Sequence, residues 1–373
     1  MSSRATTFRL ATRGSDLALR QTGAIRDALE SRRHEVELLE VETTGDELHD
    51  ELIHRLGKTG AFVHSLDERV RAGEADAAVH SLKDVPTEDR EGLTVAAVPE
   101  RAPANDVLVT PDGTELADLP EGATVGTSSL RRRAQLLAER PDLDIQPLRG
   151  NVDTRVEKLL APSVQAESTA RLDAEESEVT TEAGNDETKA TGQTFEQSFE
   201  EWFDSLAEIE RRATEREVET EYDAIVLAEA GLDRLGLTHH LDFQALPDEQ
   251  FVPAPGQGVV AVVAEEGEKA ETIRDLVDDA RTRVEATVER TILETLGGGC
   301  VAPIGVSAQF RGRVVTTTAR VLAPDGTEEI TDRRSLPVEA HPEAAREMGE
   351  DLAEEGAAEL IERAREMAED DDA

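Results

Sequence analysis

Phe8-Arg9-Leu10-Ala11-Thr12 is a short apolar stretch typical of a buried strand, and Arg13-Gly14-Ser15 follows it directly. Ser15 is a common residue type at helix N-caps, and the apolar positions after it recur with helical spacing. Further along the chain, strand patterns at 35–42 and 75–80 flank a helical pattern at 62–71. This order predicts an open, mostly parallel α/β sheet with helices on its faces.

A second run of the same kind begins after Arg101-Ala102-Pro103-Ala104-Asn105, which we interpret as a crossover between two lobes. Strands are expected at 107–110, 124–127, 144–148 and 223–228, and helices at 128–139 and 152–160. A late apolar strand at 258–264 is expected to return to the first lobe. The pattern predicts two hinged, doubly wound lobes like those of periplasmic binding proteins.

The C-terminal part of the chain has a different pattern. A helix is expected at 284–296, three antiparallel strands at 306–310, 313–322 and 328–336, and one closing helix at 343–367. This predicts a smaller α+β domain with a three-stranded antiparallel sheet. The expected domains are 1–100 with 258–279, then 104–252, then 281–373.

Residues from about 160 to 221 interrupt the second lobe with an acidic, polar segment. The part from Ala174 to Thr194 is predicted to be disordered, and 195–216 could form an amphipathic helix. We interpret the segment as an insertion, because surface loops tolerate extra length at low cost. A partner-binding element is the less favoured alternative.

The charge of the chain is extreme, with 82 acidic and 40 basic residues and a formal net charge of −42. Only five of the basic residues are lysines. Such a surface suits a salty cytoplasm, where counterions screen the self-repulsion. Nucleic acid is an unfavourable partner for this field. Neither a targeting segment nor a membrane-spanning run is recognisable, so we expect a cytoplasmic protein.

Cys300 is the single cysteine, and three glycines precede it in Gly297-Gly298-Gly299-Cys300. A lone thiol cannot form an intrachain disulfide or a multi-cysteine metal site. A buried structural cysteine is the ordinary interpretation. The glycines favour a second one, a thiol that carries a bulky group covalently, because they leave the backbone open on that side.

Arginines and hydroxyl side chains gather at three expected strand-to-helix turns. These turns are Arg13-Gly14-Ser15, Gly126 to Arg133 and Leu148 to Arg155. Helix N-termini and forked guanidiniums favour carboxylates or phosphates, and such turns meet at the carboxyl edge of a doubly wound sheet. Solvated helix faces are the alternative, but the repetition favours a site for a polyanion.

His80-Ser81-Leu82-Lys83-Asp84-Val85-Pro86 follows another expected strand. Asp84 has a cation beside it and a rigid proline turn after it, so its carboxylate could stabilise a developing cation or move a proton. His80 is more often a packed residue than a catalyst. Among the motifs we sought, no catalytic triad, phosphate loop, dinucleotide fingerprint or His/Cys metal spacing is present in the sequence.

Taken together, these motifs resemble those of the porphobilinogen deaminase (hydroxymethylbilane synthase) family. The matching stretches run in order over nearly the whole chain outside the insertion. They are 10–15, 80–86, 126–132, 148–155, 222–228, 230–237, 255–258 and 298–305.

The resemblance implies a transferase of tetrapyrrole biosynthesis. Members of the family carry a dipyrromethane primer as a thioether on a cysteine, which corresponds to Cys300. Four porphobilinogen units are added head to tail, each with loss of ammonia through an electrophilic methylene-pyrrolenine, and water releases hydroxymethylbilane. The catalytic aspartate of the family corresponds to Asp84. No metal or nucleotide is implied, and a monomer is expected.

The resemblance also implies which residues bind the acetate and propionate groups of the pyrroles. The expected primer-binding residues are Arg131, Arg132, Ser129, Lys83, Ser81 and Asp84. The expected substrate-binding residues are Arg13, Ser15, Phe62, Thr127, Ser128, Arg149, Arg155, Arg234, Gln257 and Lys58. Lys58 is displaced by one position from the family's usual Gly-Gly-Lys-Gly pattern, so its role is the least supported of the set.

Two other functions are compatible with parts of this pattern. A two-lobed, non-catalytic anion-binding protein would share the architecture but would give Cys300 and Asp84 no task. A cysteine hydrolase would need a histidine partner that the sequence does not identify.

Overall fold

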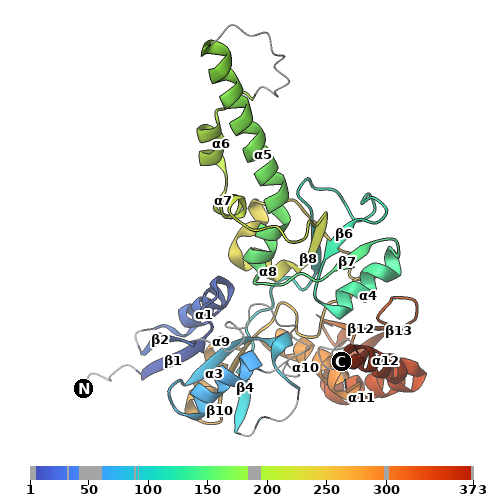
Figure 1. Ribbon diagram of the computed structural model, residues 1–373. Helices are drawn as coiled ribbons and strands as arrows, with labels where there is room; N and C mark the ends of the chain where they lie inside the picture. The colour runs from blue at the N-terminus through green and yellow to red at the C-terminus, as the bar shows by residue number, and fades with distance from the viewer. Residues whose placement is uncertain are drawn as a thin grey trace.

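The computed structural model describes residues 6–31, 33–41, 61–87, 90, 92–183, 195–297 and 302–370. Three sheets organise the chain, and each has its own covering helices (Figure 1). Two are five-stranded and mixed, and the third is three-stranded and antiparallel. The predicted fold class, two α/β lobes with a smaller C-terminal α+β unit, is therefore confirmed.

The first sheet has the strand order β2-β1-β3-β10-β4. Its strands are β1 (Thr6–Thr12), β2 (His34–Glu40), β3 (Ala77–Ser81), β4 (Leu93–Ala97) and β10 (Val260–Glu265). The helices α1 (Asp16–Leu29), α3 (Ala61–Arg71) and α9 (Glu268–Val277) pack against it and form the first lobe with it. As predicted, the side chain of Ser15 caps α1 by accepting from the Ala18 amide, and the late strand β10 returns to this lobe.

The second sheet has the order β7-β6-β8-β5-β9 and forms the second lobe with its helices. Its strands are β5 (Asp106–Val109), β6 (Thr124–Gly126), β7 (Asp144–Gln146), β8 (Ala224–Ala228) and β9 (Phe243–Ala245). Its helices are α4 (Leu130–Glu139), α5 (Val152–Ala183), α6 (Phe199–Ser205), α7 (Glu208–Thr214) and α8 (Glu229–Leu235), with the short helix η2 (Leu237–His239) after them.

Each five-stranded sheet is mostly parallel, as the strand–helix order predicted, with one strand that runs against the other four. In the first sheet β10 runs antiparallel to both β3 and β4, and in the second β5 runs antiparallel to both β8 and β9. The reason is that β5 and β10 enter their sheets directly from the other lobe, without a crossover helix. Two chain segments, 98–105 and 246–259, therefore connect the lobes.

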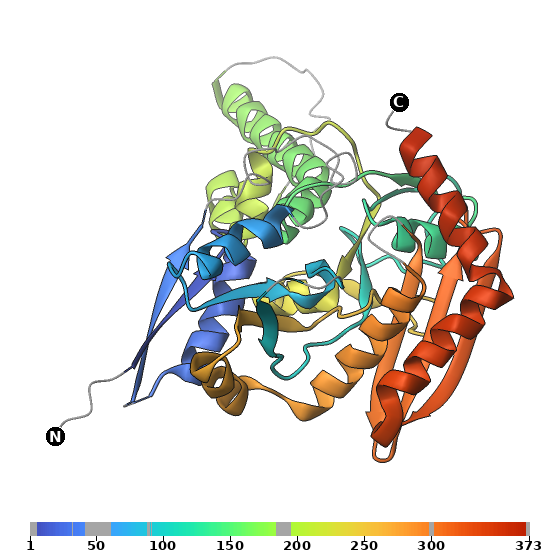
Figure 2. The same ribbon diagram turned by 90° about the horizontal axis from the view of Figure 1, so that it is seen from below.

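The third sheet, with its helices, forms the C-terminal unit. Its strands are β11 (Ile304–Arg311), β12 (Val314–Leu322) and β13 (Glu329–Pro337). The helices α10 (Ala280–Thr295), α11 (His341–Leu352) and α12 (Ala358–Asp370) pack against it (Figure 2). A single closing helix was the wrong prediction, because Gly356 has a φ of 115°, and this conformation breaks the run between α11 and α12.

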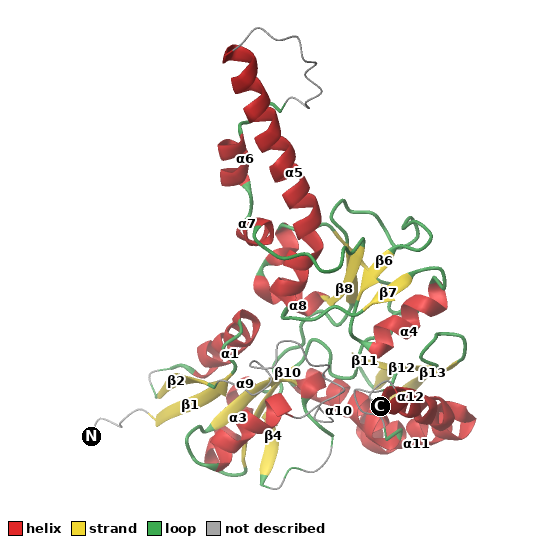
Figure 3. Ribbon diagram, in the orientation of Figure 1, coloured by secondary structure: helices red, strands yellow, loops and turns green. Residues whose placement is uncertain are grey.

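The acidic insertion is more helical than the sequence suggested. The helix expected at 152–160 continues as α5 to Ala183, so the first part of the segment predicted to be disordered is helical. Residues 184–194 lie outside the described part of the chain. The single helix expected at 195–216 is two short helices, α6 and α7, and together with α5 they project from the second lobe (Figure 3).

The apolar packing of this helical arm is continuous with the core of the second lobe, because Val107 of β5 and Leu227 of β8 belong to the same cluster. Trp202 and Ile209 are buried in the same cluster as Leu159 and Val164 of α5. Near the base of the arm, Arg212 and Arg216 of α7 both bind the buried carboxylate of Glu157. Among the described residues, no helix is both long and apolar enough to cross a membrane.

Candidate active site

The turn that carries Lys83 and Asp84 follows the C-terminal end of β3 in the first lobe. It is a short 3-10 helix, η1 (Leu82–Asp84), and the Val85 amide closes it by donating to the Leu82 carbonyl over 3.1 Å. Lys83 and Asp84 are both exposed, whereas Leu82 and Val85 are buried on either side of them. The ammonium and the carboxylate are therefore accessible to solvent at the end of β3.

Lys83 faces cations of the other lobe. Burial between the lobes lowers its pKa, and Arg132 and Arg155 lower it further, although Asp84 and Asp106 act in the opposite direction. Solvent still reaches the side chain, so neighbouring groups near the surface, and not a closed core, cause this desolvation. The electrostatic coupling brings one residue of the first lobe together with two arginines of the second.

His80 lies on the strand that leads to this turn and is structural, as its type suggested. Its Nε2 is 2.9 Å from Oδ1 of Asp67 on α3, and Arg90 donates to the other oxygen of Asp67 over 2.8 Å. His80 and Asp67 are buried. The triad fixes β3 to α3 beneath the turn.

The turn after β6 delivers Arg131 and Arg132 at the start of α4. Both are buried and both bind Asp106 at the start of β5, over 2.6 Å from Arg131 Nη1 and 2.9 Å from Arg132 Nη2. Burial alone would raise the pKa of Asp106, but the two guanidiniums outweigh it and hold that pKa well below its usual range. Two cations share one carboxylate, so this cluster keeps a net positive charge.

Arg155 lies in the first turn of α5 and is half-buried. Its Nε donates to the Gly150 carbonyl over 2.8 Å. Burial, and then repulsion from Arg132, lower its pKa to about 10. Arg149, on the loop before this helix, is also half-buried. The guanidinium of Arg155 therefore remains charged at neutral pH, and no carboxylate among the described residues pairs with it.

The predicted hydroxyl residues have clear structural contacts. Ser129 caps α4 by accepting from the Arg132 amide, and Thr127 Oγ1 accepts from the Ser129 amide over 3.2 Å. Ser128 exchanges hydrogen bonds with both backbone groups of Leu148 and so ties the β6 turn to the β7 turn. These serines and this threonine hold the arginine-bearing turns in place.

Gln257 and Arg234 connect the second lobe to the returning chain segment. The Gln257 amide donates to Asp106 Oδ1 over 2.8 Å and to the Ala104 carbonyl over 2.6 Å, and the residue is buried. Arg234 of α8 donates to the Gly258 carbonyl over 2.7 Å. Burial lowers the pKa of Arg234, although Asp233 opposes the effect.

Arg13 lies between β1 and α1 and is half-buried. The helix α1 that follows it contacts α8 of the second lobe.

Three of the predicted residues cannot be placed in this geometry. Cys300 and Lys58 lie outside the described residues. Phe62 belongs to the first turn of α3, but its side chain is also outside the description. The described end of α10 and the start of β11, at Gly297 and Ala302, flank the segment that contains Cys300.

Two residues that sequence reasoning missed organise this site. Asp106 is the acidic start of an otherwise apolar strand, Asp106-Val107-Leu108-Val109, and that isolated charge was the available signal. Glu289 of α10 is fully buried and accepts from Arg101, from the Gly256 amide over 2.7 Å and from the Ala308 amide over 2.8 Å. Glu289 therefore joins both crossing segments to the C-terminal unit.

The donor set suits a ligand with several carboxylates. Lys83, Arg131, Arg132 and Arg155 provide four cations, and Asp84 and Asp106 provide two anions. Guanidiniums bind carboxylates through paired hydrogen bonds, and a partly desolvated cleft strengthens them. No group of three or more metal-binding side chains occurs in the part of the chain that is described.

Two family models match the chain in order. The porphobilinogen deaminase dipyromethane cofactor binding domain matches residues 8–179 and 206–273, and the porphobilinogen deaminase C-terminal domain matches 283–358. The chain belongs to the porphobilinogen deaminase family. The first model leaves residues 180–205 unmatched, and these lie within the segment interpreted as an insertion.

Curated relatives of the porphobilinogen deaminase family match along nearly the full chain. A probable porphobilinogen deaminase of Halobacterium salinarum is 50% identical over 96% of this chain and 98% of its own length. A porphobilinogen deaminase of Campylobacter fetus is 34% identical over 96% of this chain and 99% of its own length.

Solved structures resemble the chain more distantly. The methionine-binding protein MetQ shares 11% identity over 74% of this chain and 92% of its own, with a TM-score of 0.37. The periplasmic domain of BvgS from B. pertussis shares 13% over 74% of this chain and 41% of its own, with a TM-score of 0.34. Scores this low do not define a common fold.

Proposed function

We propose that this chain performs the porphobilinogen deaminase reaction with Asp84 as its catalytic carboxylate and Cys300 as the attachment point of its primer. The activity itself, the joining of porphobilinogen units in tetrapyrrole biosynthesis, belongs to the family of the chain. The observation that supports the residue assignment is that Lys83, next to Asp84, lies close enough to Arg132 and Arg155 of the second lobe for their charges to lower its pKa. We place the cleft for the substrate between the lobes at this point.

Dipyrromethane is the cofactor of the family, and it supplies a pyrrole carbon on which the chain of rings grows. The cations of this cleft fit its acetate and propionate groups, because they outnumber the acids beside them. We assign to the primer Arg131, Arg132, Ser129, Lys83, Ser81 and Asp84. We assign to the substrate Arg13, Ser15, Phe62, Thr127, Ser128, Arg149, Arg155, Arg234, Gln257 and Lys58.

Asp84 has the task of a general acid–base and electrostatic group. Its carboxylate accepts hydrogen bonds from pyrrole N–H groups and stabilises the positive charge that develops as ammonia departs. Its neighbour Lys83 binds a ring carboxylate, and it places a positive charge beside the Asp84 carboxylate. The arginines fix the acidic side chains of the rings, so that only the reacting atoms move.

The first prediction concerns Asp84. Asp84→Asn lowers kcat by about 10² to 10⁴-fold, the usual range for loss of a general acid–base group, and leaves the primer attached. Steady-state porphobilinogen consumption and the intact mass of the purified protein measure these two quantities. Cys300→Ser is the matched control, and we expect it to lack both the added mass and the activity. Wild-type protein that has only the mass of its amino acids and consumes no porphobilinogen contradicts the proposal.

We also propose the organisation that surrounds this chemistry. The domains are 1–100 with 258–279, then 104–252, then 281–373, and the sheet order supports them because β10 lies in the first sheet. We propose a cytoplasmic monomer adapted to high salt. Light scattering of the purified protein tests the monomer.

A further inference from the structure

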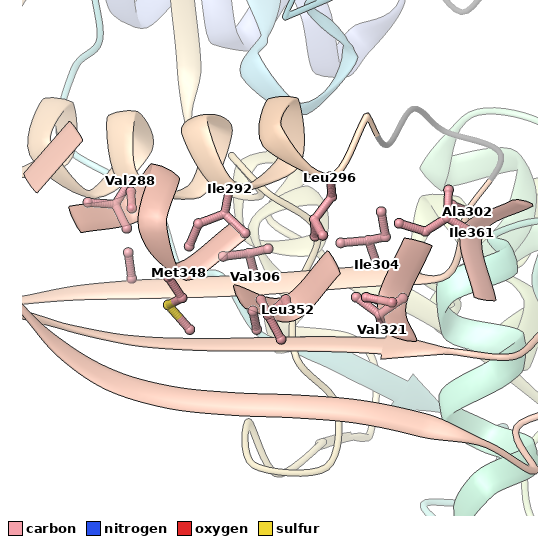
Figure 4. Close-up of a cluster of buried hydrophobic side chains, with 14 of the residues drawn as sticks. Val288, Ile292, Leu296, Ala302, Ile304, Val306, Val321, Met348, Leu352 and Ile361 are labelled. Carbon is pink, nitrogen blue, oxygen red and sulfur yellow. The ribbon is translucent and has the colours of Figure 1, made fainter. Parts of the chain in front are cut away.

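Helix α10 of the C-terminal unit has two faces with different neighbours. Val288, Ile292 and Leu296 lie on one face and pack into the apolar cluster above β11 and β12 (Figure 4). Arg283, Thr287, Arg290 and Glu294 follow a second helical spacing and line a cavity of about 230 Å³. Leu82 of the η1 turn and Val95 of β4 form the opposite wall of the cavity. The polar face of α10 therefore lies against the first lobe, directly behind the turn that carries Asp84.

Arg290 crosses from this face to the backbone of that turn. Its Nη1 donates to the Val85 carbonyl over 2.7 Å and is 3.4 Å from the Leu82 carbonyl, and its Nη2 donates to the Pro86 carbonyl over 2.7 Å. In sequence, the Leu82 carbonyl precedes Asp84, and the Val85 and Pro86 carbonyls follow it. Burial, and then repulsion from Arg90, lower the pKa of Arg290 to about 10, so the side chain is charged at neutral pH.

A rigid fork suits this arrangement better than a single ammonium. Guanidinium nitrogens in a fixed plane can donate to two carbonyls at once, whereas a lysine at the same position offers one point charge on a flexible stem. Pro86 lacks an N–H, and the turn has one internal hydrogen bond among the described backbone pairs, from Val85 to Leu82. Arg290 therefore adds hydrogen bonds that restrain the two residues on the C-terminal side of Asp84.

Arg283 is a natural comparison on the same helix. It lines the same cavity and also donates to carbonyls of the first lobe, those of Val95 and Ala96 on β4. It differs in that it binds Asp278 and does not reach the η1 turn. Loss of either arginine weakens the contact between α10 and the first lobe, but only Arg290 restrains the segment around Asp84.

We infer that Arg290 is a positioning residue for Asp84, through which the C-terminal unit fixes the catalytic carboxylate of the first lobe. This inference rests on the proposed role of Asp84. It assigns to α10 a part in the chemistry beyond linking the C-terminal unit to the lobes. The hydrogen bonds that Arg290 forms in the described part of the chain go to the backbone of the η1 turn and not to the arginines assigned to the substrate, so we expect its loss to affect kcat far more than KM.

The test compares Arg290→Lys with Arg283→Lys in the full-length, primer-loaded protein. Arg290→Lys lowers kcat by on the order of tenfold to a hundredfold with KM unchanged, because a small misplacement of a catalytic group costs that much. Arg283→Lys leaves kcat close to the wild-type value, because Arg283 binds β4 and Asp278 and not the η1 turn. Intact mass confirms equal primer loading, and thermal unfolding shows whether both variants lose similar stability.

A second variant separates position from folding. Arg290→Ala enlarges the cavity, and millimolar guanidinium is expected to restore part of its kcat without restoring its unfolding temperature. Equal kcat values for the two lysine variants, or an effect of Arg290→Lys on KM alone, overturn the inference.

Amide hydrogen exchange gives a readout that does not require activity. Exchange at Val85 is expected to rise in Arg290→Lys and to remain at the wild-type rate in Arg283→Lys. A wild type that consumes no porphobilinogen contradicts the proposed function alone, since the exchange experiment still decides whether Arg290 restrains the turn. Unchanged exchange in both variants contradicts the positioning role.

Discussion

The carboxylate of Asp106 binds two arginines and one glutamine although solvent does not reach it. The arginines come from α4, and Gln257 comes from the segment that returns to the first lobe. A buried acid with this many partners holds Arg131 and Arg132 in one orientation. It also leaves them with surplus positive charge for a ligand.

Asp106→Asn is expected to destabilise the folded protein by about 3–5 kcal/mol at neutral pH, because it leaves two buried guanidiniums without their counter-charge. Thermal or denaturant unfolding measures the loss. Asp84→Asn is the matched control, since Asp84 is exposed and its replacement leaves the unfolding temperature nearly unchanged. Equal stabilities of the two variants would disprove the structural role of Asp106.

The effect of Asp106 depends on pH in a definite direction. The pKa of its carboxyl is lower in the folded protein than in the unfolded chain, where it is about 3.9. Its contribution to stability is therefore complete above that value and is lost as the pH falls further. The stability difference between wild type and Asp106→Asn should narrow when unfolding is measured below about pH 4.

At the scale of elements, the two chain segments that connect the lobes lie side by side. The Ala102 amide donates to the Gly258 carbonyl over 3.2 Å, and the Gln257 side chain donates to the Ala104 carbonyl. Gly258 has a φ of 81°, and a Cβ there would lie 2.4 Å from the Ala102 carbonyl oxygen. This close approach explains the glycine in Pro255-Gly256-Gln257-Gly258.

Gly258→Ala is therefore expected to destabilise the protein by more than the roughly 1–2 kcal/mol that a left-handed backbone costs an alanine. Gly236→Ala is the matched control, because Gly236 has a similar φ of 71° but open space around its Cα. Chemical denaturation of both variants measures their free energies of unfolding. The difference between the two losses gives the cost of the contact with the Ala102 carbonyl, apart from the cost of the left-handed backbone. If Gly258→Ala loses no more stability than Gly236→Ala, the two segments are not packed as tightly as described.

The helical arm shows where sequence patterning fails at this scale. Its polar, acidic composition predicted disorder for Ala174 to Thr194, yet α5 continues to Ala183. Arg171 lies over the rings of Phe195 and Trp202, and the Phe199 amide donates to Glu175 over 2.6 Å. These contacts join residues more than twenty positions apart, so a local composition window does not detect them.

At the scale of the whole molecule, the net charge of −42 opposes folding through self-repulsion. The surplus acids repel one another, because acidic residues outnumber basic ones by 82 to 40. Salt shortens the screening length from about 10 Å at 0.1 M to about 3 Å at 1 M. The unfolding temperature should therefore rise over this range.

We expect the rise to exceed about 2 °C, the shift that 1 kcal/mol produces in a protein of some 200 residues. Unfolding scans in increasing potassium chloride measure it. Sucrose at matched osmolality is the control, because it is excluded from the protein surface but does not screen charges. An unfolding temperature that does not change with salt would mean that the acidic surface does not limit stability.

Most helices and strands whose pattern of apolar residues or capping residue lies within the element itself were predicted correctly. The first strand, the Ser15 cap and the strands of the C-terminal sheet follow from local periodicity and capping. The helix break at Gly356 was missed, because an isolated glycine is tolerated within many helices. The site residues assigned from the family resemblance stay predictions, and Cys300 and Lys58 lie outside the described residues.

The sequence alone determined the family, the three-part architecture and the residue types that gather at the strand ends, because these are written in contiguous motifs. Only the tertiary structure decided which side chains and backbone groups contact one another. Arg131 and Gln257 are 126 residues apart in sequence, and Arg290 and Pro86 are 204 residues apart. Such pairs depend on how β5, β10 and α10 cross between the units. The local sequence pattern does not predict these crossings, because the hydrogen bonds and ion pairs join residues that are close in space but far apart in sequence.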